Sequence, residues 1–505
     1  MGQAAKPKCP LLPFLLRKPW LCHGLISPTR MHDNYYQTKE FEQLLDKYEV
    51  AMQHGDSVYF EPDDLTDIAE FYHLHGQTQK ARAACDYALN IFPGATAPTV
   101  FKARAAMVID DNPAEARRIL ATANDKTDLE YYYMEAELLL YENKSDEASA
   151  YLQDIFQQLD DEDDRADFVL DVATLYADYQ RFEEAQHWLS LSDESDEPDY
   201  RELRARIAVS KGDIDEAETI LNDLIDEDPY DGRYWNHLAS AHLNGGRMHD
   251  AIDATDFSIA INPNDQEAIY TKAYALFVLN KYEEAIDNFN HYCALGPSDP
   301  NGWYYLGMSY LNIERFDEAL ESFRKARQLS NINDDILFQI YQEQAFILAH
   351  QGQLEEAEQN IAEALKLATT GQQQQELAVL HGHVLLVCGH LLKAHQYFLK
   401  AIVDSNQSPH AYLRIAISVY DCGYMRLAYK LFKLLFSQTG EEWADGYAYM
   451  ALCCYDLALH GEYMHYLEKA CTLNPNEAAL VLFELFPDNM PVDDYVEYAR
   501  QSIAG

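Results

Sequence analysis

Residues 300–333 read PNGWYYLGMSYLNIERFDEALESFRKARQLSNIN, and this stretch decides the fold. Apolar residues recur with helical spacing on both sides of the turn signal ERFDEA at residues 314–319. The pattern predicts two amphipathic helices of roughly a dozen residues joined by a tight turn. One such pair cannot bury its apolar face alone, so it needs similar pairs on either side.

The same pattern recurs along most of the chain. Ala319 belongs to a series of alanines spaced 32–38 residues apart, each preceded by a turn signal such as KGDIDEA or NKYEEA. The series comprises Ala81, Ala116, Ala148, Ala185, Ala217, Ala251, Ala285, Ala319, Ala357, Ala394 and Ala428, and a looser unit surrounds Tyr463. Length alone would divide 505 residues into several compact domains. The repeat instead predicts one continuous all-α solenoid over residues 31–505.

Three repeats carry nearly every residue of one pattern. In residues 232–265, 266–299 and 300–333 the marked positions hold Trp235, Leu238, Ala239, Gly246, Ala251 and Pro263; Ala273, Tyr282, Ala285, Phe289 and Pro297; and Trp303, Leu306, Gly307, Tyr310, Ala319, Phe323 and Ala326. The pattern resembles the tetratricopeptide repeat family: Trp-x2-Leu-Gly-x2-Tyr, then Ala, an aromatic residue, Ala and a closing Pro. The resemblance covers about 12 units, roughly residues 62–476, and implies a right-handed superhelix.

The residue types at these positions have a physical reason. Small residues such as Ala239 and Ala251 let the two helices of a pair approach closely, while Trp303 and Phe323 fill the space between repeats. A proline such as Pro263 ends the second helix, because the residue before it is pushed out of the α region.

The quality of the repeat varies along the chain. Residues 62–197 form degenerate repeats, residues 198–333 well-formed ones, and residues 334–476 further repeats of the same type. Residues 31–61 predict an N-terminal capping helix and residues 477–505 a C-terminal capping segment. The acidic linkers at residues 157–164 and 192–199 predict loosening of the array, and the tract GQQQQ at 371–375 predicts an exposed joint.

Residues 1–30 do not match the rest of the chain. They carry five Lys or Arg and no acid, and five of the 18 prolines. Arg17 and Lys18 interrupt the apolar run CPLLPFLL, which disfavours a signal peptide. A disordered extension or a mis-assigned translation start before Met31 is predicted, with a cleaved export signal as the alternative.

The charge of the chain narrows the range of partners. Asp and Glu number 84 against 38 Lys and Arg, which gives a net charge of −46. Such a surface repels phosphate backbones and anionic lipid, so neither nucleic acid nor a membrane is expected as a partner. The excess either serves solubility or favours basic partners, and the sequence leaves both open.

The sequence predicts no metal site, no cofactor and no catalytic centre. Its nine cysteines form no CxxC pair, which is typical of a reduced, cytoplasmic protein. His381, His383, Cys388, His390 and His395 are close in sequence, but the repeat spacing places them on different helical faces and they cannot form a tetrahedral site. Nucleophile, nucleotide-binding and metalloprotease motifs are absent.

The resemblance implies a binding groove instead. In the family, six positions of the first helix line a concave groove that grips an extended or helical peptide. Carried onto this chain, they hold Arg206, Arg233, Asn236, Asn244, Tyr270, Tyr274, Phe277, Asn301, Tyr304, Tyr305, Met308, Asn312, Gln342 and Phe346. Tyrosine and methionine can supply adaptable contact area, and asparagine can bind a peptide backbone. With 36 tyrosines in the chain, an aromatic groove could equally reflect composition.

The function expected from the resemblance is a non-catalytic scaffold that binds a partner protein or peptide. The alternative is a co-chaperone or assembly factor that holds client or exported polypeptides. A two-carboxylate clamp for acidic tails is disfavoured, because Arg233 is the one cation in the relevant positions of residues 232–333. Whether the groove or the acidic outer surface binds the partner, and in which oligomeric state, stays open.

Overall fold

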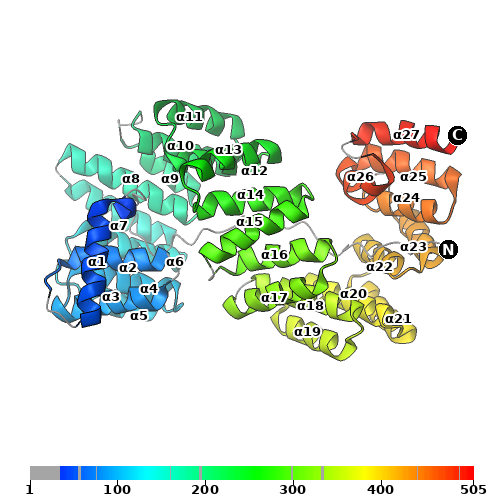
Figure 1. Cartoon of the computed structure of the whole chain (residues 1–505), viewed down its shortest axis with the longest axis horizontal. Coiled ribbons are helices and arrows are strands. Elements are labelled where there is room, and N and C mark those ends of the chain that lie inside the picture. Colours follow the sequence, from blue (N-terminus) through cyan, green and yellow to red (C-terminus); the bar gives the residue numbers. More distant parts are fainter. Residues whose placement is uncertain are drawn as a thin grey trace. The chain divides into compact units, whose positions relative to one another are not determined.

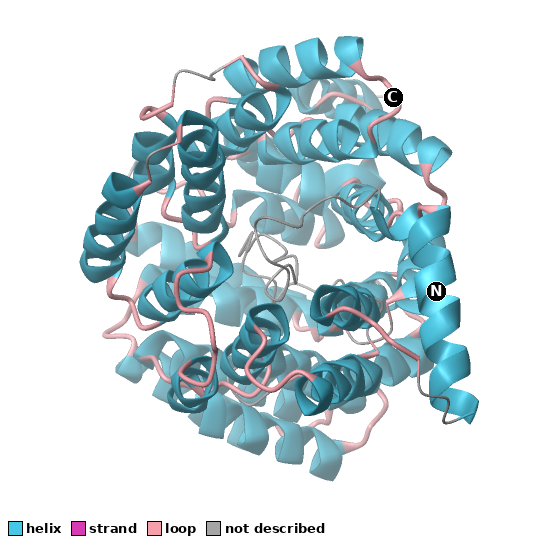
Figure 2. Cartoon of the chain, turned by 90° about the vertical axis from the view of Figure 1, so that its left-hand side faces the viewer, coloured by secondary structure: helices cyan, strands magenta, loops and turns pink. Residues whose placement is uncertain are grey.

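The structure is a computed structural model that describes residues 35–504, except 55–57, 75–76, 160, 193–195, 297–298, 331–334, 441 and 488–489. The segment 1–30, with its alternative readings, and Met31 lie outside the described residues. The described part of the chain consists of helices joined by short loops and contains no strand, as Figures 1 and 2 show. The predicted all-α solenoid is confirmed.

Most helices form antiparallel pairs. The first helices of the pairs are α2 (Pro62–Leu74), α4 (Thr96–Val108), α6 (Leu129–Tyr141), α8 (Glu162–Asp178), α10 (Pro198–Lys211), α12 (Gly232–Asn244), α14 (Gln266–Val278), α16 (Pro300–Asn312), α18 (Asp335–His350), α20 (Gly371–Val387), α22 (Pro409–Asp421) and α24 (Tyr447–Asp456). The second helices are α3 (Thr78–Ile91), α5 (Pro113–Leu120), α7 (Ser145–Gln158), α9 (Phe182–Leu189), α11 (Ile214–Glu227), α13 (Met248–Ile261), α15 (Tyr282–Leu295), α17 (Phe316–Leu329), α19 (Leu354–Leu367), α21 (Leu391–Asp404), α23 (Met425–Gln438) and α25 (His460–Leu473). Each first helix contacts its own second helix.

The contacts divide the chain into two compact units between Asp299 and Pro300. We call the described residues 35–299 the N-terminal unit and residues 300–504 the C-terminal unit. In the N-terminal unit each first helix from α2 to α12 also contacts the next first helix, and α16 to α22 do the same in the C-terminal unit. Stacking of this kind buries the face that a single pair leaves exposed.

The recurring alanines lie where the helices of a pair meet. Each of the eleven, from Ala81 to Ala428, is at most 2% exposed. Gly307 and Gly382 fill the facing position of their first helices, where an added Cβ would lie 2.8 Å from Phe323 and 2.4 Å from Phe398, respectively. Close approach of the two helices therefore explains the small residues at both positions.

From α4–α5 to α24–α25, the turn within each pair has a recurrent backbone conformation. One residue of the turn has a positive φ, and it is glycine in some repeats but a residue with a side chain in others. These residues are Asp111, Asn143, Gln180, Gly212, Gly246, Asn280, Glu314, Gly352, Gly389, Gly423 and Ala458. Glycine adopts this left-handed conformation at no steric cost, whereas Glu and Ala do so at some cost.

The degenerate repeats differ in the length of their second helices. Helices α5 and α9 have 8 residues each, whereas α11, α13 and α15 have 14. Aromatic side chains fill the space beside the short helix α9, where Trp188 packs on Phe156 and Phe168 with ring centroids 5.7 and 6.0 Å apart. The acidic linkers beside this region fall partly on residues 160 and 193–195, which are not described.

The two ends carry additional helices. The short helix η2 (Tyr35–Gln37) and α1 (Lys39–His54) precede the first pair, and α1 buries Phe41, Tyr48 and Ala51. Helices α26 (Pro475–Leu482), η3 (Phe483–Leu485) and α27 (Val492–Ala504) follow the last pair.

The tract predicted as an exposed joint at residues 371–375 is largely exposed, but it is helical. The tract GQQQQ forms the first turn of α20, where Thr370 is the N-cap. Thr370 Oγ1 accepts a hydrogen bond from the Gln373 backbone N–H, and the Gln373 side chain accepts one from the Thr370 N–H, which makes a capping box.

Candidate protein-binding face

The side chains that link one repeat to the next lie on the first helices. We call the surface formed by the second, fifth, sixth, ninth, twelfth and thirteenth residues of each first helix the first-helix face. In both units, hydrogen bonds, ion pairs and ring contacts cross this face from one first helix to the next. Their chemistry differs between the two units.

In the N-terminal unit, a buried ion pair joins α4 to α6. Arg104 Nε donates to Glu137 Oε2 at 2.7 Å, and the two side chains are 2% and 7% exposed. The hydroxyl of Tyr179, at the end of α8, donates to the other carboxylate oxygen of Glu137 at 3.3 Å. Buried charges of opposite sign need such partners, because each alone would lose its hydration without compensation.

A second link joins α6 to α8. The Tyr133 hydroxyl donates to Asp171 Oδ2 at 2.9 Å. Burial raises the pKa of Asp171 to about 7, against the effect of the Tyr133 hydrogen bond, and the charges of Glu130 and Asp167 raise it further. Burial, with a smaller contribution from the neighbouring carboxylates, therefore opposes ionisation of Asp171.

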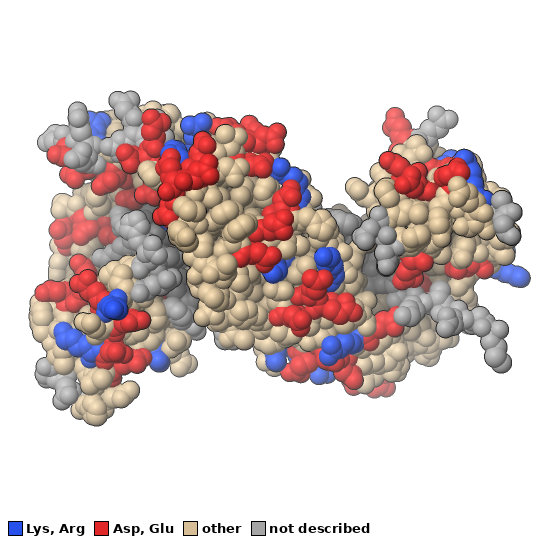
Figure 3. Space-filling model, turned by 45° about the horizontal axis from the view of Figure 1, so that its top comes forward, with Lys and Arg blue, Asp and Glu red and all other residues tan. Residues whose placement is uncertain are grey.

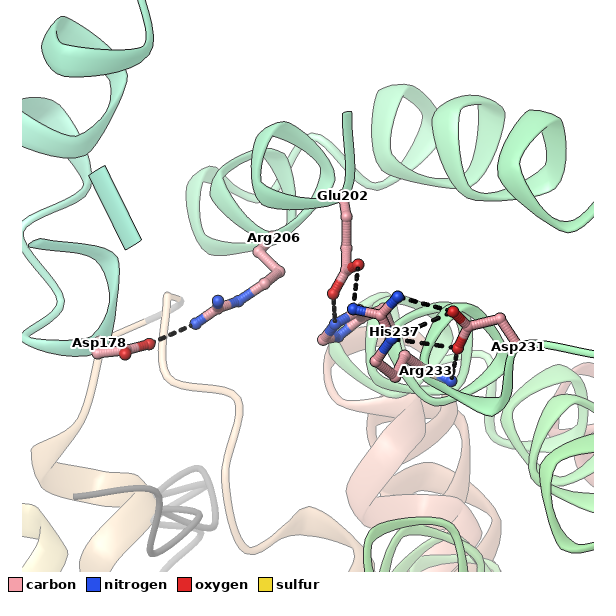
Figure 4. A network of polar contacts seen from close by, with 6 residues as sticks. All are labelled: Asp178, Glu202, Arg206, Asp231, Arg233 and His237. Carbon is pink, nitrogen blue, oxygen red and sulfur yellow. Dashed lines mark hydrogen bonds and ion pairs between the residues drawn. The ribbon is translucent and has the colours of Figure 1, made fainter. Parts of the chain in front are cut away.

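The third link runs from α8 through α10 to α12 (Figure 4). On α10, Arg206 points to Asp178 at the end of α8, with 2.7 Å between Nη2 and Oδ1. Glu202, one turn earlier on α10, points to α12 instead and contacts His237 at 2.9 Å and Arg233 at 3.4 Å.

The contacts of this third link lower the pKa of Glu202 and so favour its ionised form. Burial alone would raise the pKa of Glu202, but the His237 hydrogen bond and the charges of Arg233 and Arg206 lower it to about 2. Arg233 also donates to Asp231 Oδ2 at 2.7 Å, while the Asp231 side chain caps α12. The guanidinium groups of this face are thus held by carboxylates of the chain itself.

Carboxylates outnumber cations on the first-helix face of the N-terminal unit. At the six positions the carboxylates are Asp63, Asp67, Glu70, Glu130, Glu137, Asp167, Asp199, Glu202 and Glu267, and the guanidinium groups are Arg104, Arg206 and Arg233. Asp171 and Asp178 of α8 adjoin this face through the links described above. Among the charged residues of this unit that are visible in Figure 3, Asp and Glu predominate over Lys and Arg. The face has the charge that suits a partner with lysine and arginine.

In the C-terminal unit, the corresponding links are aromatic and neutral. Phe346 on α18 stacks on His383 of α20, with ring centroids 5.2 Å apart. Nδ1 of His383 lies 2.9 Å from the Ser418 hydroxyl on α22 and 3.7 Å from Cys422 Sγ. Tyr420 on α22 donates a hydrogen bond to a carboxylate of α24. One ion pair, Arg414 with Glu376 at 2.9 Å, also joins α20 and α22.

His383 is fully buried, and its Nε2 has no hydrogen-bond partner among the described residues. Burial, together with the nearby His350, lowers the pKa of His383 to about 3. The imidazole is therefore neutral at physiological pH and acts as a packed ring.

The structure separates the predicted groove residues into two groups. Asn236, Tyr270, Tyr274, Tyr304, Met308 and Phe346 are buried, whereas Arg206, Arg233, Asn244, Phe277, Asn301, Tyr305, Asn312 and Gln342 are at least partly exposed. Asn236 donates to Asp265 at 2.9 Å, and Asn244 and Asn312 donate to backbone oxygens of their own helices. The asparagines thus make intramolecular bonds in this structure.

Sequence reasoning missed the links in the degenerate repeats, including Arg104, Glu137, Tyr133 and Asp171. A usable signal exists, since Arg104 and Glu137 occupy the same position of successive first helices and carry opposite charges. Comparison of equivalent positions between neighbouring repeats would have found this pair.

Other kinds of site receive no support in the described ranges. They contain no group of three His, Cys, Asp or Glu side chains that could hold a metal ion. None of their helices combines the length and apolar character needed to cross a bilayer. A cavity of about 870 Å³ opens between α17, α18 and α19, and it is lined by Arg324 and Arg327 as well as Glu355 and Glu356.

A family described as anaphase-promoting complex, cyclosome, subunit 3 matches residues 210–292 and 259–326. MamA 41-end from Desulfovibrio magneticus RS-1 is 21% identical, with a TM-score of 0.32, and the match covers 34% of this chain and 95% of that one. YrrB, described as "a TPR protein with an unusual peptide-binding site", is 20% identical, with a TM-score of 0.33 and coverage of 38% and 95%. No curated protein matches the sequence.

The matched family covers the best-formed repeats, and the helical pairs that flank them repeat the same backbone turn and the same buried alanine. The family match is confined to residues 210–326, and the described part of the chain as a whole is an all-α array of tetratricopeptide-type helical pairs.

Proposed function

We propose that the chain is a non-catalytic scaffold of the cytoplasm that holds a basic segment of a partner protein on the first-helix face of the N-terminal unit. The observation that carries this proposal is the row of carboxylates on α2 to α14, which outnumber the arginines of the same face. Proteins of this repeat type generally serve as interaction scaffolds.

Preorganisation supports a specific partner over a range of client polypeptides. Arg104, Glu202 and Arg206 are held by bonds to neighbouring helices, so the face loses little side-chain freedom when it binds. A co-chaperone that accepts many unrelated segments is better served by a flexible apolar surface. The ionic face of the N-terminal unit favours one partner chemistry.

The test uses a fluorescent dodecapeptide rich in lysine and arginine and the full chain. Asp167→Asn with Glu130→Gln removes two negative charges from the first-helix face, and Asp223→Asn with Asp226→Asn removes two from exposed positions of α11. We expect the first variant to bind the peptide at least fivefold more weakly at 150 mM salt and the second to bind within twofold of wild type. Equal losses would assign the binding to general surface charge and overturn the proposal.

A partner from cells can be located independently. A photo-cross-linking amino acid at His237 should capture the partner, whereas the same residue at Asp223 on α11 should not. Cross-links from α11 alone would place the partner on the outer surface and contradict the assignment of the first-helix face.

A further inference from the structure

Helices α21 and α23 differ in charge from the rest of this acidic chain. Residues 391–438 contain Lys393, Lys400, Arg414, Arg426, Lys430 and Lys433 but only two acids, Asp404 and Asp421, in a chain of net charge −46. Neither helix has an acid in its first turn, where α7, α9, α11, α15, α17 and α19 each have two. These two helices thus lack the favourable interaction of an acidic side chain with the positive end of the helix dipole.

The same two helices expose large aliphatic side chains. Leu392 and Val403 of α21 are 84% and 72% exposed, and Leu399 lies between them on the same helical stripe. On α23, Leu427 and Leu434 are also exposed and lie seven residues apart, on one stripe. Several large aliphatic side chains exposed on the second helices of two successive repeats indicate an interaction site.

Repeat equivalence shows how the two stripes are arranged. Residues of α21 and α23 correspond at a spacing of 34, so Leu427 and Leu434 occupy the positions of Lys393 and Lys400. His381 of α20 contacts Glu358 of α19, in the preceding repeat, at 3.4 Å. Burial lowers the pKa of His381, and the charges of Lys393 and Lys400 also lower it, so these two lysines lie on the edge of α21 nearest the preceding repeat. The equivalent edge of α23 therefore faces α21.

The cations then border the aliphatic residues on both sides. Lys393 and Lys400 lie on the far side of α21, whereas Arg426 and Lys430 share a stripe of α23 with Lys433, which pairs with Glu462 of α25 at 2.7 Å. Among the described residues, Lys393, Lys400, Arg426 and Lys430 have no carboxylate within ion-pair distance. The result is an aliphatic strip between two rows of cations, of which Lys433 alone is paired with a carboxylate in the described part of the chain.

We propose that this second-helix strip, formed by α21 and α23, binds an amphipathic helix of a partner protein whose apolar stripe is flanked by Asp and Glu. The apolar stripe of such a helix would cover the leucines, and its acidic flanks would meet the two cation rows. An anionic membrane fits less well, because the remaining surface of the chain is strongly acidic and would be repelled. The strip is separate from the first-helix face, so it provides a second site with the opposite charge preference.

The experiment measures binding of a fluorescent 18-residue peptide, with leucines at helical i, i+3, i+4 and i+7 spacing and glutamates on both flanks, to the full chain. We expect it to bind at least tenfold more tightly than a scrambled peptide of the same composition. Leu392→Ser with Val403→Ser should weaken binding at least tenfold. Lys400→Gln with Lys430→Gln should weaken it about threefold to tenfold at low salt and less at high salt.

Matched controls isolate the strip. Leu365→Ser with Arg324→Gln makes similar changes at exposed positions of α19 and α17 and should leave binding within twofold. Asp167→Asn with Glu130→Gln, which tests the first-helix face, should also leave it unchanged. Because all these positions are on the surface, helicity and the unfolding temperature should stay close to those of wild type.

Three results would overturn the proposal. The first is a peptide that binds no better than its scrambled form up to 1 mM. The second is a concentration-dependent dimer in sedimentation equilibrium that Leu392→Ser with Val403→Ser abolishes, since the strip would then bind a second copy. The third is loss of binding to vesicles of anionic lipid in the same variant, with no peptide binding, which would make the strip a membrane contact.

Discussion

In the two units, successive first helices are joined by contacts of different chemistry. Both must connect each first helix to the next, and the backbone arrangement is the same. The N-terminal unit uses the ionic contacts of Arg104, Arg206 and Glu202, whereas the C-terminal unit uses the stacked rings of Phe346 and His383 and a row of hydroxyl contacts. The same fold therefore accommodates both ionic and aromatic links between first helices.

The largest expected difference concerns the buried ion pair. Arg104→Ala leaves Glu137 buried without its counter-charge, so we expect a loss of about 3–5 kcal/mol in the free energy of unfolding of the N-terminal unit. Arg82→Ala, at an exposed ion pair with Asp110, should cost about 0–1 kcal/mol. Hydrogen exchange should accelerate in α4 to α8 and leave the C-terminal unit unchanged. Equal acceleration of both units would show that they unfold as one.

The second difference is the response of the C-terminal unit to acid. The folded pKa of His383, about 3, lies below its usual value of 6.5, so its contribution is fully present above pH 6.5 and is lost as the pH falls. Between pH 7 and pH 5 this loss should amount to about 2 kcal/mol. Urea unfolding followed by hydrogen exchange should locate it in α18 to α22. His383→Gln should flatten the dependence, and His395→Gln, on the exposed side of α21, should not.

The third difference is the response of the N-terminal unit to acid, which should stabilise this unit where it destabilises the C-terminal unit. The folded pKa of Asp171, about 7, lies above its usual 3.8, so the ionised carboxylate destabilises the N-terminal unit above pH 7 and ceases to do so as the pH falls towards 4. Asp171→Asn should raise the free energy of unfolding of this unit by about 1–2 kcal/mol at pH 8 and by almost nothing at pH 4. Because Asp171 is partly exposed, solvent screening keeps the gain at pH 8 below the full effect of the pKa shift. A pH-independent effect would assign the gain to packing and not to charge.

The smallest expected difference concerns the turns. Gly212 in the N-terminal unit and Glu314 in the C-terminal unit both have a positive φ. Gly212→Ala should destabilise by about 1 kcal/mol, and Glu314→Gly should stabilise by about 0.5 kcal/mol, because only glycine adopts this conformation without strain. Thermal unfolding of the two single variants measures both effects, and a stabilising Gly212→Ala would contradict the explanation.

The sequence predicted the repeat well because its spacing follows from packing. Each alanine of the series must be small wherever two helices meet, so the signal recurs in every unit. The accessibility of the groove residues was harder to predict. Tyr270 and Tyr304 occupy groove positions, but their neighbours bury them, and a side chain's position in a helix does not tell whether adjacent residues will cover it.

The contacts between first helices could not be predicted from local sequence patterns either. Tyr133 and Asp171 are 38 residues apart in sequence, and nothing near either residue indicates the other. The strip on α21 and α23 was visible as a local change of composition, yet its meaning depends on which residues the neighbouring helices leave exposed.

The left-handed residue of each turn has a consequence for how such a chain can change in length. Gly212, Gly246 and Asn280 lie 34 residues apart and share one backbone conformation. A genetic exchange between any two of these points would remove or duplicate one whole helical pair and rejoin the chain with its local geometry intact. The turns are thus natural crossover points, and the array can gain or lose units without redesign of the junction.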